Sequence, residues 1–169
     1  ITGNATGRWV VNLSGGLAFA AAIVYLAYTG SPLELDKLLA SSRGAIMIPV
    51  ALMCFAGITK SAQMPFSSWL LGAMVAPTPT SALLHSSTMV KAGVYLILRF
   101  SPVLQGSLVG DLVAFVGGVT FLLAAFIAIS QSNAKKVLAY STVSNLGLIV
   151  ACAGVGTPGA VWAGIFLVI

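Results

Sequence analysis

Charged residues are scarce in this chain of 169 residues. They make up only 7% of it, whereas a soluble globular domain carries roughly 25%. Hydrophobic residues make up 59%, and the mean hydropathy is +1.05. This composition excludes an ordinary soluble domain and predicts a polytopic membrane protein. The basic residues form no dense stripe, so the net charge of +5 does not indicate a nucleic-acid partner.

Cysteine, histidine and acidic residues are also few, which limits the chemistry of the chain. Cys54 and Cys152 each lie alone in a hydrophobic run, and we interpret them as small apolar residues. The sequence shows no metal-ligand cluster and no nucleophile triad, so we expect no metal site, no catalytic site and no cofactor in this chain. The chain begins with Ile1 and ends inside an apolar run, so we expect it to be part of a longer polypeptide.

Long apolar runs are abundant, and a bilayer-spanning helix needs roughly 20 such residues. The sequence therefore predicts an all-α bundle of about five to six transmembrane spans. The expected spans cover residues 9–28, 44–76 in two parts, 80–99, 108–129 and 137–155, and a sixth begins at residue 160. After the first span, Ser31, Pro32 and Glu34 predict the start of a short helix that lies at the interface or against the protein, without spanning.

The second apolar run, from Gly44 to about Ala76, is too long for one simple span. Its pattern breaks at KSAQMP, which starts at Lys60 and ends at Pro65. Proline removes a backbone donor and clashes with the preceding turn. We therefore expect a broken helix, with one half ending near Lys60 and the other starting at Pro65. Irregular backbone at membrane depth is tolerated only inside protein or beside a wet cavity, so the break indicates a functional site.

Three ionisable residues lie inside the predicted spans: Lys60 at the break, and His85 and Lys91 in the span that follows. A charge at the bilayer centre costs about 2.5–3.5 kcal/mol or more, so such residues usually have a function. Burial disfavours the charged form of a lysine, and a nearby carboxylate favours it, so moving that carboxylate can load and unload a proton. Histidine titrates near neutral pH without tuning.

These residues therefore predict a stepwise proton relay through Lys60, His85 and Lys91. His85 and Lys91 are about 9 Å apart along a helix axis and do not share a face, so we expect water between them. The expected polar support comes from Ser61, Gln63, Ser81, Ser86, Ser87 and Thr88. Simpler interpretations stay open: Lys60 as an interface lysine at a helix end, and His85 as a core histidine bonded to a backbone carbonyl.

The basic residues near the span ends do not decide the orientation by number. If the spans alternate, Arg8, Lys135 and Lys136 share one side, and Lys37, Arg43 and Arg99 share the other, which is three against three. The compact pair Lys135 and Lys136 weakly favours its own side as cytoplasmic.

Two stretches resemble a known family. KSAQMPFSSWLLGAMVAPTPTSALLHSSTMVKAGVYL resembles the core signature of the antiporter-like proton-translocating membrane subunits, and KKVLAYSTVSNLG resembles a second signature of that family. The family includes complex I subunits of the subunit 5 type, Mrp antiporter subunits of the A and D types, and membrane subunits of hydrogenase and formate hydrogenlyase complexes. The resemblance implies a multi-pass protein of the inner or plasma membrane, with residues 1–169 as roughly one half-repeat of a transmembrane proton-translocating domain.

The resemblance also implies roles. Lys60 matches the lysine of the broken helix, His85 the histidine of the next helix, and Lys91 a lysine found there in some branches, while the Lys135 side is implied to be cytoplasmic. The family pairs the first lysine with a glutamate on an earlier helix. The acidic residues of this chain, Glu34, Asp36 and Asp111, lie outside the spans or at their edges.

Three functional hypotheses follow. The first is a non-redox ion-translocating subunit of a complex I-like NADH:quinone oxidoreductase or hydrogenase complex, with redox cofactors and redox-arm subunits as partners beside further antiporter-like membrane subunits. The alternative is an Mrp-type Na⁺/H⁺ antiporter subunit driven by ion gradients alone. The third is a scaffold segment whose charges only organise the bundle.

Overall fold

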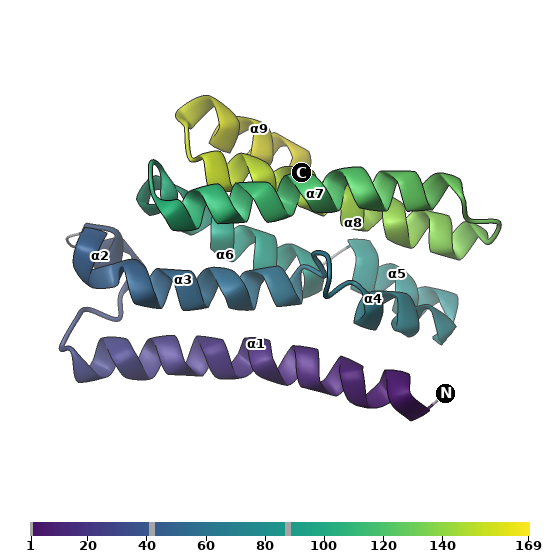
Figure 1. Ribbon diagram of the computed structural model, residues 1–169, viewed down its shortest axis with the longest axis horizontal. Coiled ribbons are helices and arrows are strands. Elements are labelled where there is room, and N and C mark those ends of the chain that lie inside the picture. Colours follow the sequence, from purple (N-terminus) through teal and green to yellow (C-terminus); the bar gives the residue numbers. More distant parts are fainter. Residues whose placement is uncertain (1, 41–42, 87–88) are drawn as a thin grey trace.

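The computed structural model describes residues 2–40, 43–86 and 89–169, with side chains for most of them. All regular structure in these ranges is helical (Figure 1). The elements are α1 Thr2–Tyr28, α2 Leu35–Ala40, α3 Arg43–Lys60, α4 Ser68–Gly72, the 3₁₀ turn η1 Ala73–Val75, α5 Thr78–Ser86, α6 Met89–Leu104, α7 Leu108–Ile129, α8 Ala134–Val155 and α9 Pro158–Val168. The predicted all-α membrane bundle is confirmed.

Three of the described helices are long and apolar enough to cross a bilayer: Trp9–Tyr28 of α1, α7 and α8. α7 agrees with the predicted boundaries at both ends, whereas α1 ends as predicted at Tyr28 but begins at Thr2, seven residues before the predicted start at Trp9. α8 begins at Ala134, three residues before the predicted start at Val137. The reason is the Asn133 side chain, which accepts a hydrogen bond from the Lys135 N–H at 3.0 Å and so starts the helix early.

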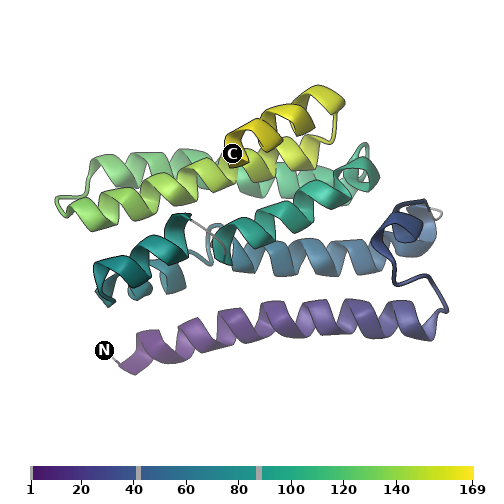
Figure 2. The same ribbon diagram turned by 180° about the vertical axis from the view of Figure 1, so that it is seen from behind.

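The helices run alongside one another, up and down (Figure 1). α1 packs on α3, α3 on α6, α6 on α8, and α8 on α7 and α9. Figures 1 and 2 both place the N-terminus and the α7–α8 turn at one end of the molecule, and α2 at the other. The Arg8 end of α1 and the Lys135–Lys136 pair therefore lie on one side, as the alternation of spans predicts.

α2 is the short helix predicted after the first span, although it begins at Leu35. It buries Leu38 and turns its charged residues outward. Lys37 pairs with Glu34 at 2.9 Å, and Arg99 of α6 donates to Asp36 at 3.1 Å. Two of the three acidic residues are thus paired with basic residues at this end of the bundle.

α7 and α8 touch backbone to backbone along glycines spaced seven residues apart, Gly110 and Gly117 on one helix and Gly147 and Gly154 on the other. A Cβ atom on Gly147 would lie 2.8 Å from the Gly117 carbonyl oxygen, and one on Gly154 would lie 2.7 Å from that of Gly110. Ser144 adds a hydrogen bond to the Phe121 carbonyl at 3.1 Å. Small residues at both helix faces permit this approach in a membrane.

The predicted break after Lys60 is confirmed, but its second half begins later than expected. α4 starts at Ser68, because Pro65 lies in a turn in which the Phe66 N–H donates to the Gln63 carbonyl at 2.6 Å. The predicted span 80–99 is described as two helices, α5 and α6, on either side of residues 87–88, which lie outside the described part of the chain. α6 extends to Leu104, beyond the predicted end at Arg99.

Candidate functional site at the break in α3

The candidate site lies where α3 ends. The last four carbonyls of a helix lack partners within it, and inside a membrane water does not supply them. Here Ser61 Oγ donates to the Gly57 carbonyl at 2.7 Å, and the buried Trp69 Nε1–H of α4 donates to the Thr59 carbonyl at 3.1 Å. Ala62 takes a positive φ of 54° directly after these residues. Short local bonds thus stabilise the end of the helix.

A third hydrogen bond ties the break to the other half of the bundle. The Met64 N–H donates to Thr120 Oγ1 of α7 at 3.1 Å, and the same hydroxyl donates to the Val116 carbonyl at 2.7 Å. Thr120 is fully buried in a helix that is otherwise almost entirely apolar. Sequence reasoning missed Thr120, Trp69 and Thr59; the signal for Thr120 was a lone hydroxyl near the middle of the most apolar span.

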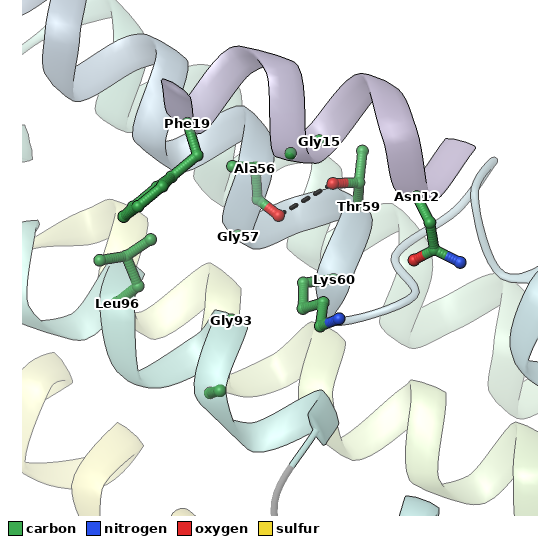
Figure 3. A pocket seen from close by; sticks show the side chains of 11 residues that line it. Asn12, Gly15, Phe19, Ala56, Gly57, Thr59, Lys60, Gly93 and Leu96 are labelled. Carbon is green, nitrogen blue, oxygen red and sulfur yellow. Dashed lines mark hydrogen bonds between the residues drawn. The ribbon is translucent and has the colours of Figure 1, made fainter. Parts of the chain in front are cut away.

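Lys60 is half-buried and lies at the meeting point of two cavities. One, of about 310 Å³, is formed by α1, α3 and α6, and Figure 3 shows Lys60 with Asn12 of α1 on one side and Gly93 of α6 on the other. The second, of about 440 Å³, adds Trp9, Trp69 and Met89. Among the described residues, Lys60 makes no hydrogen bond and no ion pair, and no other lining residue of either cavity is charged.

Gln63 and Ser61, both predicted as polar support, are completely buried beside the break. Gln63 Nε2 donates to the Ser61 carbonyl at 3.3 Å, whereas Gln63 Oε1 accepts no hydrogen bond from the described residues. Buried polar atoms are nearly always hydrogen-bonded in native proteins. Gln63 therefore places an acceptor inside the protein three residues beyond Lys60.

Lys91 lies on another side of α6. It is half-buried, and its ammonium group donates to the Val168 carbonyl of α9 at 2.9 Å. Lys91 lines neither of the two cavities that Lys60 enters. The structure thus brings Lys60 together with Ser61 and Gln63, and does not bring Lys91 to them.

The remaining predicted residues fall into two groups. His85 and Ser86 belong to α5, but their side chains are not described, and Ser87 and Thr88 lie outside the described residues. Ser81 is 7% exposed and donates to Met74 Sδ at 3.6 Å. It lines a third cavity, of about 200 Å³, together with Lys135 at the start of α8. Lys135 and Lys136 are both exposed.

No group of three histidine, cysteine or acidic residues that could hold a metal ion occurs among the described residues. The break places the Lys60 amine in a pocket whose other described lining residues are uncharged, next to the polar side chains of Ser61 and Gln63.

Comparison with known proteins identifies the family of this chain. Residues 8–169 match the family model described as NADH:quinone oxidoreductase/Mrp antiporter, TM. The chain is 43% identical over 162 residues to a protein of Rhizobium meliloti (strain 1021) described as an A/B subunit of a K(+)/H(+) antiporter, a match that covers 92% of this chain and 16% of the relative. It is 42% identical to a protein described as antiporter subunit mnhA2 of Staphylococcus aureus (strain MRSA252), covering 88% of this chain and 19% of the relative.

Two solved structures are similar in fold. The Mrp complex from Dietzia sp. DQ12-45-1b matches with a TM-score of 0.85 and 40% identity, covering 98% of this chain and 19% of that one. The membrane-bound sulfane sulfur reductase, an archaeal respiratory membrane complex, matches with a TM-score of 0.80 and 24% identity, covering 99% of this chain and 30% of that one. The chain spans less than a fifth of the length of the two relatives above. It is an integral membrane protein and belongs to the NADH:quinone oxidoreductase/Mrp antiporter transmembrane family.

Proposed function

We propose that this chain is the proton-conducting part of an A-type subunit of a multi-subunit monovalent cation/proton antiporter. The observation that carries the proposal is Lys60: a half-buried amine at a helix break, open to two cavities and unpaired with any described acidic residue. An ionisable residue at such a depth is expected to serve transport.

The break explains how Lys60 can exchange protons. The carbonyls at the end of α3 are satisfied by Ser61 and Trp69, so the chain can leave the helix without disturbing the bundle. The cavities, which are lined in part by α1 and α4, give water a route to the ammonium group. In this proposal Lys60 passes protons to and from water in these two cavities.

In this proposal, protons leave Lys60 through water, because Lys60 makes no hydrogen bond to another described residue. Gln63 Oε1 offers an acceptor beyond Lys60, and Lys91 is held by the Val168 carbonyl on a different side of α6. We assign His85, supported by Ser81, Ser86, Ser87 and Thr88, to the step between the two lysines. Protons enter or leave by the side that carries Lys135 and Lys136, which we assign to the cytoplasm.

The relatives favour an antiporter driven by ion gradients over a redox-driven pump. The relatives described above are named as antiporter subunits at 42–43% identity, and the solved Mrp complex is 40% identical. The sulfane sulfur reductase, at 24% identity, supports the fold only. We therefore propose other membrane subunits of an antiporter as partners, with no redox cofactor in this chain and no redox arm.

The test measures cation-induced collapse of a pH gradient in inverted membrane vesicles that contain the full complex. An artificially imposed gradient, with no electron donor present, should collapse when Na⁺ or K⁺ is added, and vesicles lacking the complex serve as the control. A gradient that responds only to an electron donor would favour the redox-driven hypothesis. If transport survives unchanged in Lys60→Met and Lys91→Met together, the lysines only organise the bundle and the proposal is wrong.

A further inference from the structure

We propose that Gly57 of α3 and Gly93 of α6 are positioning residues for Lys60, because their close crossing sets where the ammonium group lies in its cavity. This inference rests on the proposed function above, since the position of Lys60 matters for transport only if Lys60 carries protons. Neither glycine belongs to the relay residues, and neither carries a side chain that could itself move a proton.

Backbone atoms set how closely α3 and α6 approach each other at Gly57 and Gly93. A Cβ atom added to Gly93 would lie 2.5 Å from the Gly57 carbonyl oxygen and 3.0 Å from the Ser61 nitrogen. Rotation of a side chain cannot relieve contacts with backbone, so a larger residue at position 93 must push the two helices apart. α6 can approach the end of α3 this closely only because residue 93 is glycine.

The close approach of α6 at Gly93 also involves the side chain of Lys60. The added Cβ atom on Gly93 would lie 3.2 Å from Lys60 Cβ, so α6 bears directly on the base of the lysine side chain. From the other helix, a Cβ atom on Gly57 would lie 2.9 Å from the Gly93 carbonyl oxygen and 2.8 Å from Ile97 Cγ1. The closest approach of the two helices therefore lies within one turn of Lys60.

Both glycines also line the cavity that Lys60 enters (Figure 3). Apart from Lys60, the described residues lining this cavity and the second one contain no titratable group. Moving α6 away from α3 would therefore change the width of the cavity and the hydration of the ammonium group without removing a charged partner. We therefore expect the rate of transport to change, because the surroundings of Lys60 change.

The chain contains a matched steric control. A Cβ atom on Gly154 would lie 2.7 Å from the Gly110 carbonyl oxygen and 2.8 Å from Ala114 Cα, which is a backbone clash of similar severity between α7 and α8. Neither Gly110 nor Gly154 lines the two cavities that Lys60 enters. Gly118 has nothing within 4 Å of an added Cβ atom and serves as the unobstructed control.

The first experiment measures how fast an N-hydroxysuccinimide ester acylates Lys60 in the full complex, read by mass spectrometry across a range of pH. We expect Gly93→Ala to change the rate at Lys60 by about threefold or more, since small displacements alter reactivity strongly. The rate at exposed Lys135 in the same sample should not change. Gly154→Ala and Gly118→Ala should leave the Lys60 rate at its wild-type value.

The second experiment measures cation-driven proton flux per assembled complex for the same variants. Gly93→Ala should lower the maximal flux and displace its pH profile, with the half-saturating cation concentration unchanged, whereas Gly154→Ala should lower only the amount of complex. If Gly93→Ala does not assemble, Gly57→Ala is used, because part of its clash falls on the flexible Ile97 side chain.

Equal acylation rates and equal pH profiles in the Gly93→Ala and Gly154→Ala complexes would overturn the inference. Its failure can be distinguished from failure of the proposed function by Lys60→Ala. If Lys60→Ala abolishes flux while Gly93→Ala behaves like Gly154→Ala, only the positioning role is wrong. If Lys60→Ala transports normally, the proposed function itself is wrong.

Discussion

The helix pairs α7–α8 and α3–α6 differ in how their backbone hydrogen bonds are satisfied. α7 and α8 are each 22 residues long, about 33 Å, and run without interruption, so their backbone hydrogen bonds are satisfied within each helix. α3 stops at Lys60, and the chain beyond it depends on Ser61, Trp69 and Thr120 for its partners. Both pairs use glycines at their crossings. The difference is that only the second brings a charge and a cavity to the crossing.

Under the proposed function, the α7–α8 pair supports the bundle and the α3–α6 pair carries out transport. The α7–α8 pair packs closely along its glycines, and Thr120 of α7 accepts a hydrogen bond from the break of the other pair. In the α3–α6 pair, the regular hydrogen bonding of α3 ends at Lys60, and the Lys60 amine lies within the bundle. Variants of the first pair should therefore reduce the amount of protein, and variants of the second should reduce the transport of each molecule.

The largest effect should come from Gly147→Leu in the α7–α8 pair. The added side chain meets the Gly117 carbonyl and the Phe121 nitrogen, which cannot rotate away. Overpacking costs about 1–3 kcal/mol even where side chains can adjust, so we expect about a tenfold or greater loss of assembled protein. Gly118→Leu is the control, since its added side chain has open space at the Cβ position. Normal assembly of Gly147→Leu would show that the two helices can separate without consequence.

Thr120→Val tests the link between the two helix pairs, because the Thr120 hydroxyl joins α7 to the break after α3. The change removes the acceptor of the Met64 N–H and leaves that donor buried, at a cost of about 1–3 kcal/mol. We expect lower thermal stability and lower flux per complex together. Thr142→Val is the matched control, because the Thr142 hydroxyl donates only within its own helix, to the Leu138 carbonyl at 2.9 Å. Equal loss in both variants would argue against a role for the tie to α7.

Trp69→Phe should have a smaller effect at the break. The change keeps an aromatic ring but removes the Nε1–H bond to the Thr59 carbonyl, a net loss of about 0.5–1.5 kcal/mol. Flux per complex should fall moderately, since Thr59 directly precedes Lys60 in the last turn of α3. Trp162→Phe, at a side chain that is 71% exposed, provides the control. Identical flux in the two variants would mean that the last turn of α3 does not need this bond.

The smallest effect should follow Asp36→Asn at the far end of the bundle. The ion pair between Asp36 and Arg99 is largely exposed, and such pairs contribute little to stability. We expect unchanged flux and unchanged assembly, measured in low and high salt. A clear loss of flux would show that charges outside the α3–α6 crossing take part in transport, and the contrast between the two pairs would then be too simple.

Much of the fold could be predicted from the sequence, because apolar length and charge placement decide membrane spans. The helix Leu108–Ile129 was predicted at both ends and α1 at its end, Tyr28, although α1 begins seven residues before the predicted start. The break at Lys60 followed from the polar KSAQMP stretch. The start of α4 was wrong by three residues, because the turn around Pro65 depends on a backbone bond between Phe66 and Gln63 that has no sequence pattern.

The site was predicted less completely. Lys60, Ser61 and Gln63 were found because polar residues stand out in an apolar run. Thr120 and Trp69 were not found, because their partners lie 56 and 10 residues away in the chain and only tertiary contact brings them together. The roles of all the predicted relay and support residues stay predictions, those of Lys60, His85 and Lys91 included.

The most direct test of the central claim is proton flux through purified complex in proteoliposomes, comparing Lys60→Ala with the wild type at equal amounts of assembled protein. The account predicts a loss of about tenfold or more in cation-driven flux with assembly intact, since positioned proton-transfer groups typically contribute at least that much. Lys60→Arg, which keeps the charge but holds its proton, should be nearly as impaired. Wild-type flux in Lys60→Ala would contradict the account.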